Sequence, residues 1–303
     1  MRLLFAIPHF FPRRGPSAAS EPDDFPATSD PRSGPGRATR HGSTHGPAEL
    51  RAAKLAKTVT SLHQHLGGRR GMIRIADRTV IPADEAAATV IDVLIVTNAE
   101  DHLIAESGLS PDRFRQVIVD APPMHLGFAA QRTLARRIGE YEFYAYLEDD
   151  LVIHDPWFFR KLTWFTRQVG DDKLLQPHRY EVGTGKAVDK VYIDGDLKPH
   201  VAGRFQDVGV KPSLEGSVLG SRVRFVRPLN PHSGCFFLTG DQMSRFAGRP
   251  DFGVATGDFV GPLETAATLG VMRCFSIYKP EPAMASFLEI QHQGTDFLDL
   301  IQA

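Results

Sequence analysis

Three adjacent carboxylates, Glu148, Asp149 and Asp150, directly follow the apolar and aromatic segment 141–147. This segment has the composition and length of a buried strand, and open α/β sheets bind ligands beyond the carboxyl ends of such strands. Because side chains alternate along an extended chain, we expect Glu148 and Asp150 to point one way and Asp149 the other. Two carboxylates on one side suit Mg²⁺ or Mn²⁺, which keeps its other positions for water and a diphosphate. The alternative is an acidic turn that caps a helix in the segment 151–162.

The residues before the carboxylates form one unit with the acidic strand end. A loop that contains Gly127 leads into the segment 128–138, where apolar residues recur every fourth position and predict a helix. The next strand then ends in the three acids. This order resembles the nucleotide-sugar glycosyltransferases of the GT-A fold, family 2 in particular, in which a glycine-bearing loop precedes a helix and the next strand ends in an Asp-x-Asp motif.

The resemblance implies roles for the acidic residues. Glu148 and Asp150 occupy the two acidic positions of the motif, with Glu148 replacing its first Asp. The longer side chain of Glu148 implies a metal contact through water or a contact with the ribose, whereas Asp150 is the expected direct ligand of Mn²⁺ or Mg²⁺. Contacts with the bound donor are implied for Pro8, His9, Gly127, Arg132, Glu148 and Asp149.

The first eleven residues predict a short buried strand that breaks at Pro8. Its apolar run covers only residues 3–7, which is too short for the core of a signal peptide or for a membrane span. In the enzymes that the chain resembles, the end of a similar first strand touches the nucleotide.

A later acidic segment resembles the acceptor side of the same enzymes. Pro262 suits the first turn of a helix, and Glu264 lies just inside that helix. The resemblance implies that Glu264 takes the proton of the acceptor hydroxyl or holds the acceptor, with Asp258 as the second candidate. The alternative is that Glu264 only stabilises the helix N-terminus through the helix dipole.

His292 lies in a Gln-His-Gln-Gly segment near the end of the chain. Many GT-A enzymes return a C-terminal histidine to the metal or the diphosphate, and a neutral imidazole can bind Mn²⁺ beside carboxylates. The resemblance therefore implies His292 as a metal ligand. The alternative is an ordinary surface or core histidine.

Composition limits the class of protein. With 303 residues, 42% hydrophobic content and a formal net charge of −1, the chain can bury a large core and has no general attraction to nucleic acid or acidic lipid. Cys235 and Cys274 lack metal-type spacing, and we expect reduced thiols of a cytoplasmic protein. The chain has no apolar stretch of transmembrane length, so any membrane contact would be peripheral.

The chain is organised unevenly. Residues 12–47 are dominated by Pro, Gly, Ser, Arg and Asp, and we expect a disordered insertion there. A helix is predicted from Ala48, followed by strands at 90–96 and 115–119 with a helix over 100–107 between them. Later segments predict antiparallel strands and hairpins, at residues 191–193, 222–227 and 235–238.

The sequence therefore predicts an α/β protein with a mostly parallel central sheet, helices on both faces and a smaller antiparallel part. The resemblance adds that residues 1–303 form a single GT-A-like catalytic domain. It implies metal-dependent transfer of a sugar from a nucleoside-diphosphate sugar to the hydroxyl of a glycan, a lipid-linked compound or a small molecule. Three alternatives stay open: a nucleotidyltransferase of related fold, a metal-dependent phosphohydrolase and a non-catalytic nucleotide-sugar-binding protein.

Overall fold

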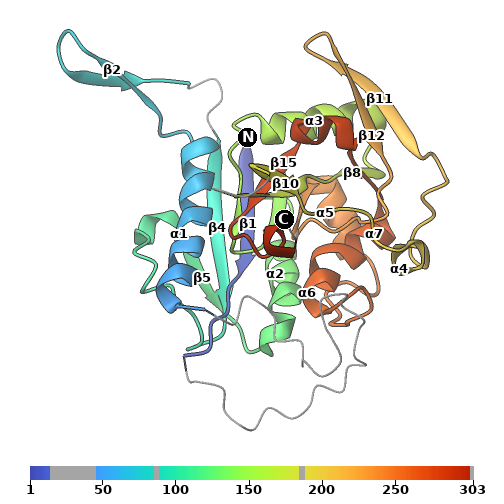
Figure 1. Ribbon diagram of the computed structural model, residues 1–303. Coiled ribbons are helices and arrows are strands. Elements are labelled where there is room, and N and C mark those ends of the chain that lie inside the picture. The colour runs from blue at the N-terminus through green and yellow to red at the C-terminus, as the bar shows by residue number, and fades with distance from the viewer. Residues whose placement is uncertain (14–45, 85–88, 184–187, 301–303) are drawn as a thin grey trace.

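The computed structural model describes residues 1–13, 46–84, 89–183 and 188–300 (Figure 1). Most of the predicted insertion at 12–47 lies outside these residues. None of the described helices is long and apolar enough to cross a membrane. Cys235 and Cys274 are both free thiols, as expected.

The central five-stranded sheet has the strand order β13-β6-β1-β4-β5. Its strands are β1 (Arg2–Pro8), β4 (Val90–Thr97), β5 (Arg115–Ile118), β6 (Phe143–Leu147) and β13 (Cys235–Thr239). The four strands β6, β1, β4 and β5 are parallel, and β13 runs antiparallel to β6. The chain moves outward from β1 to β5 and then returns to β6 on the other side of β1, so the strand order reverses between β1 and β6. In open α/β sheets this switch point is where ligands bind.

Helices cover both faces of this sheet, as predicted, because the residues of β1 alternate between two hydrophobic cores. Leu3, Phe5 and Ile7 pack with residues of α1 (Ala48–His65) and α3 (Phe158–Val169). Leu4 and Ala6 pack in the other core, with residues of α2 (Leu126–Ala135), α5 (Gly240–Ala247) and α7 (Gly270–Cys274). The prediction of a mostly parallel α/β sheet with helices on both faces is confirmed.

Two smaller four-stranded sheets contain the expected antiparallel pairs, together with two parallel ones. The first has the order β10-β9-β15-β7, with β10 (Lys190–Tyr192), β9 (His178–Val182), β15 (Glu289–His292) and β7 (Leu151–Val152). The second has the order β11-β12-β14-β8, with β11 (Ser213–Val218), β12 (Ser221–Val226), β14 (Ser276–Pro280) and β8 (Lys173–Leu175). A separate hairpin, β2 (Gly71–Arg74) and β3 (Thr79–Pro82), projects from the body (Figure 1).

The remaining elements are short. They are α4 (Pro199–Gly203), α6 (Pro262–Glu264), the π-helical turn Thr265–Leu269 that joins α6 to α7, and 3-10 turns at Pro111–Arg113, Pro123–His125, Pro282–Phe287 and Leu298–Leu300. Pro262 stands at the first position of α6, as predicted. A π turn inside a helix is frequent at functional sites.

The predicted helix over 100–107 is wrong, because this segment forms turns. Two backbone N–H groups of the segment bind histidine rings. Leu103 N donates to Nε2 of His9 at 3.1 Å, and Ile104 N donates to Nδ1 of His102 at 3.4 Å. Gly108 then takes a positive φ of 65°. Side-chain acceptors thus take the N–H groups of Leu103 and Ile104, and the segment keeps a single helical turn, closed by the hydrogen bond from Ser107 N to Leu103 O at 3.0 Å.

Candidate functional site

The switch point between β1 and β6 brings together the first strand end and the three carboxylates. Pro8 ends β1 and His9 follows it, and Glu148, Asp149 and Asp150 follow β6. The carboxylates do not cap a helix, since β7 comes next and α3 begins only at Phe158. The helix-capping alternative is therefore excluded.

Asp149 faces the end of β1, and both of its carboxylate oxygens have partners within the protein. Its Oδ2 lies 2.5 Å from Nδ1 of His9, and its Oδ1 accepts a hydrogen bond from Nη2 of Arg51 in α1. Because Nε2 of His9 accepts from Leu103 N, Nδ1 is the nitrogen that carries the proton toward Asp149. His9 and Asp149 are 1% and 5% exposed, so both act inside the protein, where they join the ends of β1 and β6.

Asp150 faces Arg51 and His292. Its Oδ2 lies 3.3 Å from Nη1 of Arg51 and 3.7 Å from Nε2 of His292. Burial raises the pKa of this carboxyl, but His292 and Arg51 outweigh that effect and lower the pKa to about 2. Asp150 is therefore ionised at any ordinary pH.

His292 reaches Asp150 from β15, the strand that pairs with β7. Its Nδ1 lies 2.8 Å from Oε1 of Glu181 in β9, and Glu181 also accepts from the backbone N–H groups of Phe297 and Leu298. Burial lowers the pKa of His292, but Asp150 and Glu181 outweigh burial and raise it above its ordinary value. A carboxylate on one imidazole nitrogen, with the other nitrogen facing a second carboxylate, is the usual setting of a metal-binding histidine.

Glu148 lies on the opposite side of β6 from His9, next to the loop that leads into β13. Its backbone N donates to Gly234 O at 3.0 Å, and a Cβ at Gly234 would lie 2.4 Å from its Oε2, so a larger residue would displace the carboxyl. Nη1 of Arg179 stays 3.9 Å from the same oxygen. Burial raises the pKa of Glu148 to about 8; Asp150 and Glu264 act in the same direction, and Arg179 opposes them.

Charge around the site is out of balance. The residues linked by these contacts comprise five carboxylates and three basic side chains, namely Glu148, Asp149, Asp150, Glu181 and Asp194 against Arg51, Arg179 and Lys279. Burial lowers the pKa of Lys279, and Lys54 acts on Asp150 from outside this set. Within this linked set, two negative charges have no matching cation when His9 and His292 are neutral. Buried carboxylates without cationic partners are costly, and protons on His292 and Glu148 reduce that cost, in keeping with the raised pKa of both groups. A divalent ion would supply the same charge.

The donor set fits a metal ion that keeps several exchangeable positions. Nε2 of His292 and Oδ2 of Asp150 face each other at a distance too long for a hydrogen bond. Among the described residues, no three His, Cys, Asp or Glu side chains converge as a complete metal cage. Mg²⁺ and Mn²⁺ are commonly held by one or two protein ligands together with water and substrate phosphate.

Glu264 and Asp258 differ in their surroundings. Glu264 lies in the first turn of α6, and its charge acts on both Glu148 and Tyr146, which places it near the end of β6. The carboxylate of Asp258 is 3.9 Å from Nη2 of Arg273, and its side chain is 53% exposed. Glu264 is thus the acid that the fold brings toward the carboxylates.

Gly127 and Arg132 have different roles in α2. A Cβ at Gly127 would lie 2.6 Å from Cβ of Ala266 and 2.9 Å from the hydroxyl of Tyr146, so glycine permits the close approach of α2 to the π-helical turn. Arg132 donates from Nη1 to Gly253 O at 2.6 Å. Its side chain therefore holds a distant loop and is not brought to the acidic strand end.

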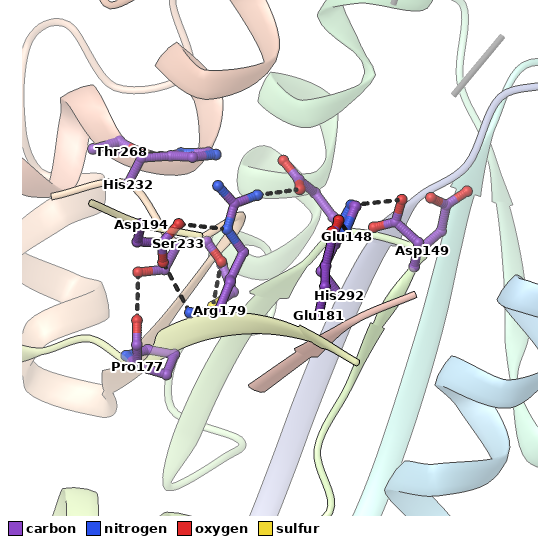
Figure 2. Close-up of polar contacts among 12 residues, drawn as sticks. Glu148, Asp149, Pro177, Arg179, Glu181, Asp194, His232, Ser233, Thr268 and His292 are labelled. Carbon is purple, nitrogen blue, oxygen red and sulfur yellow. Dashed lines mark hydrogen bonds and ion pairs between the residues drawn. The ribbon is translucent and has the colours of Figure 1, made fainter. Parts of the chain in front are cut away.

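Sequence reasoning missed three charged residues of this site: Arg51, Arg179 and Glu181. Arg51 stands four residues before Leu55, on the buried stripe of α1, and an arginine in such a stripe signals a buried carboxylate partner. Arg179 and Glu181 are two residues apart in β9, and four of the five residues of this strand are buried. Figure 2 shows how Arg179 and Glu181 extend the carboxylate cluster.

A cavity of about 620 Å³ lies elsewhere, among residues that include Met1, Glu142 and Trp164. Met1 and Glu142 precede β1 and β6, so this cavity lies at the amino edge of the sheet, away from the carboxylates. Comparison with known proteins adds nothing to this geometry, because no protein-family model and no curated protein matched the chain.

Proposed function

We propose that the chain is a metal-dependent glycosyltransferase of the GT-A fold, family 2-like, which moves a sugar from a nucleoside-diphosphate sugar to a hydroxyl acceptor. The main support is one arrangement at the switch point of a parallel sheet. Asp150 at the end of β6 faces Nε2 of His292, and Glu181 holds the other nitrogen of that ring.

The donor nucleotide would lie across the ends of β1 and β4. Pro8, His9 and Asp149 would support the nucleotide site without touching the reacting atoms, since the hydrogen bond between His9 and Asp149 holds the ends of β1 and β6 together. Gly127 would also support the site indirectly, because the absence of a side chain allows α2 to approach the π-helical turn Thr265–Leu269.

Asp150 and His292 would hold Mn²⁺ or Mg²⁺, with Glu148 reaching it through water or contacting the ribose. When bound, the ion would neutralise the charge that develops on the leaving diphosphate. Arg51 would keep Asp150 ionised and would orient both Asp149 and Asp150, because its guanidinium contacts both carboxylates.

Glu264 would take the proton of the acceptor hydroxyl. It starts α6, its charge reaches Glu148, and the adjacent π-helical turn fixes its position against α2. Asp258 would help to hold the loop before α6 in place through its contact with Arg273.

Calorimetric titration with nucleoside-diphosphate sugars, with and without Mn²⁺, tests this proposal. We expect binding of a donor that strengthens with Mn²⁺, followed by slow release of nucleoside diphosphate. Binding without turnover over a range of acceptors would favour the non-catalytic alternative, formation of a sugar nucleotide from a nucleoside triphosphate would favour the nucleotidyltransferase, and hydrolysis of simple phosphate esters would favour the phosphohydrolase.

A further inference from the structure

Arg179 is a buried cation whose orientation is fixed from one side. Its Nε donates to Oδ1 of Asp194 at 2.9 Å, and its backbone N donates to Oδ2 of the same carboxylate at 2.9 Å. Its side chain is only 8% exposed. The planar guanidinium therefore has one favoured direction, which is toward Glu148 (Figure 2).

Asp194 cannot neutralise Arg179 alone, because it is shared with a second cation. Nζ of Lys279 lies 3.0 Å from Oδ2 of Asp194 and 2.5 Å from the carbonyl of His232, and the Lys279 side chain is fully buried. Two cations thus share one carboxylate. The Nη side of the Arg179 guanidinium points away from Asp194 and toward Glu148.

Among the described residues, the outer edge of the guanidinium has only longer contacts, and the ring centroid of Phe297 lies 5.9 Å from Cζ of Arg179. Nη1 stays 3.9 Å from Glu148, which is beyond hydrogen-bonding distance. Within the part of the chain that the structure describes, Asp194 provides the only side-chain acceptor for the hydrogen bonds of Arg179. Two parallel N–H groups of a guanidinium match a carboxylate or a phosphate.

Arg179 also lies on a defined side of the site. Asp149 joins β6 to β1, where the nucleotide is proposed to bind, whereas Glu148 and Arg179 lie toward the loop 232–234 that leads into β13. The strand order places β6 between β1 and β13. The carboxylates thus lie between the proposed nucleotide site at β1 and Arg179. Arg179 would therefore lie on the side of the transferred sugar and the acceptor.

We infer that Arg179, held by Asp194 and backed by Lys279, binds an anionic group, carboxylate or phosphate, on the part of the substrate that lies beyond Glu148. This inference rests on the proposed function and narrows its substrate class. The anion belongs either to the transferred sugar, as in a uronate donor, or to the acceptor, as in a phosphorylated sugar.

A first experiment tests the anion site without any glycosyl transfer. Metal-free protein is titrated with sodium sulfate by calorimetry, using wild type, Arg179→Gln and Arg224→Gln, the last of which alters an exposed arginine paired with Glu281. We expect saturable binding that Arg179→Gln weakens by at least about 10-fold and that Arg224→Gln leaves unchanged. Equal sulfate binding in wild type and Arg179→Gln, or no binding in wild type, would overturn the inference, whatever the protein does with nucleotide sugars.

A second experiment identifies the source of the anion, with Mn²⁺ and the nucleotide kept constant. One arm compares a uronate donor with the matching neutral hexose donor, and the other compares phosphorylated with unphosphorylated sugar acceptors. We expect wild type to prefer the anionic form in one arm by at least about 10-fold, measured as kcat/KM, and Arg179→Gln to lose that preference. Absence of a preference in both arms contradicts the inference. If Arg179→Gln fails to fold, Arg179→Lys keeps the charge beside Asp194, loses the planar fork and should reduce the same preference.

Discussion

Oε1 of Glu181 lies 2.8 Å from Nδ1 of His292, so a fully buried carboxylate in β9 sets the orientation of a histidine in β15. The contact leaves Nε2 of the ring facing Asp150. Glu181 is itself held by two backbone N–H groups, from Phe297 and Leu298. The C-terminal segment, β9 and the acidic strand end are thereby linked through one imidazole.

The first prediction follows from this link. Glu181→Gln keeps the shape of the side chain but removes the charge that orients His292, so we expect Mn²⁺ affinity to fall by about 10- to 100-fold. Titration of free Mn²⁺ by electron paramagnetic resonance measures this affinity. Glu289→Gln, which alters a carboxylate of β15 paired with Lys190, serves as the control and should bind Mn²⁺ normally. An unchanged affinity in Glu181→Gln would show that His292 does not bind the metal.

The second prediction concerns Arg51, which neutralises Asp149 and Asp150 from α1. Arg51→Gln leaves two buried carboxylates without their cation, so we expect the free energy of unfolding to fall by about 3–5 kcal/mol. Mn²⁺ should restore part of this loss, since it supplies positive charge at the same place. Urea denaturation with and without Mn²⁺ measures both effects.

The matched control for Arg51 is Arg13→Gln, because Arg13 pairs with Glu106 at the surface, with both side chains about 40% exposed. We expect this change to cost less than about 1 kcal/mol. A similarly small loss in Arg51→Gln would mean that Asp149 and Asp150 are adequately solvated without the arginine.

The third prediction concerns pH. The pKa of Glu148 is raised to about 8, so this carboxyl holds a proton near neutral pH in the metal-free protein. The pKa of His292 is raised above its ordinary value by Asp150 and Glu181, so its imidazole keeps its proton to a higher pH than a free imidazole does. A metal ion requires the deprotonated forms, so Mn²⁺ affinity should fall as the pH is lowered from about 8 toward 6, and binding should release protons. Calorimetry in buffers of different ionisation enthalpy counts those protons. Affinity independent of pH over this range would be incompatible with these ligands.

The fourth prediction separates two roles of Glu264. If it takes the acceptor proton, Glu264→Gln should lower kcat by about 10²-fold or more and leave donor affinity close to that of wild type. If it only stabilises the N-terminus of α6, the change should cost under about 1 kcal/mol and leave turnover intact. Glu49→Gln, in the first turn of α1, is the control for the helix effect. Normal turnover in Glu264→Gln would exclude this residue as the base.

Much of the sheet could be predicted from the sequence, because the strands β1, β4 and β6 are short segments rich in aliphatic and aromatic residues. The position of the carboxylates beyond β6 followed from the same pattern. The pairing of β15 with β9 and β7 could not be predicted, since these strands are far apart in the sequence. Without that pairing, nothing indicated that Glu181 would meet His292.

The cations of the site were missed for a related reason. The arginines that face the carboxylates stand singly within ordered elements, Arg51 in a helix and Arg179 in a strand. Which acid each one meets depends on how α1 and β9 pack against β6, and spacing along the chain does not reveal this.

The most direct test of the proposed function is Mn²⁺-dependent release of nucleoside diphosphate from a sugar donor, measured in wild type, Asp150→Asn and Asp241→Asn. Asp150→Asn keeps the shape and removes the anionic ligand, so we expect activity to fall by at least about 10²-fold while the protein stays folded. Asp241, an exposed residue in the first turn of α5, is the control and should be dispensable. Full activity of Asp150→Asn, or wild-type activity that EDTA does not reduce, would contradict a metal-dependent transferase centred on Asp150.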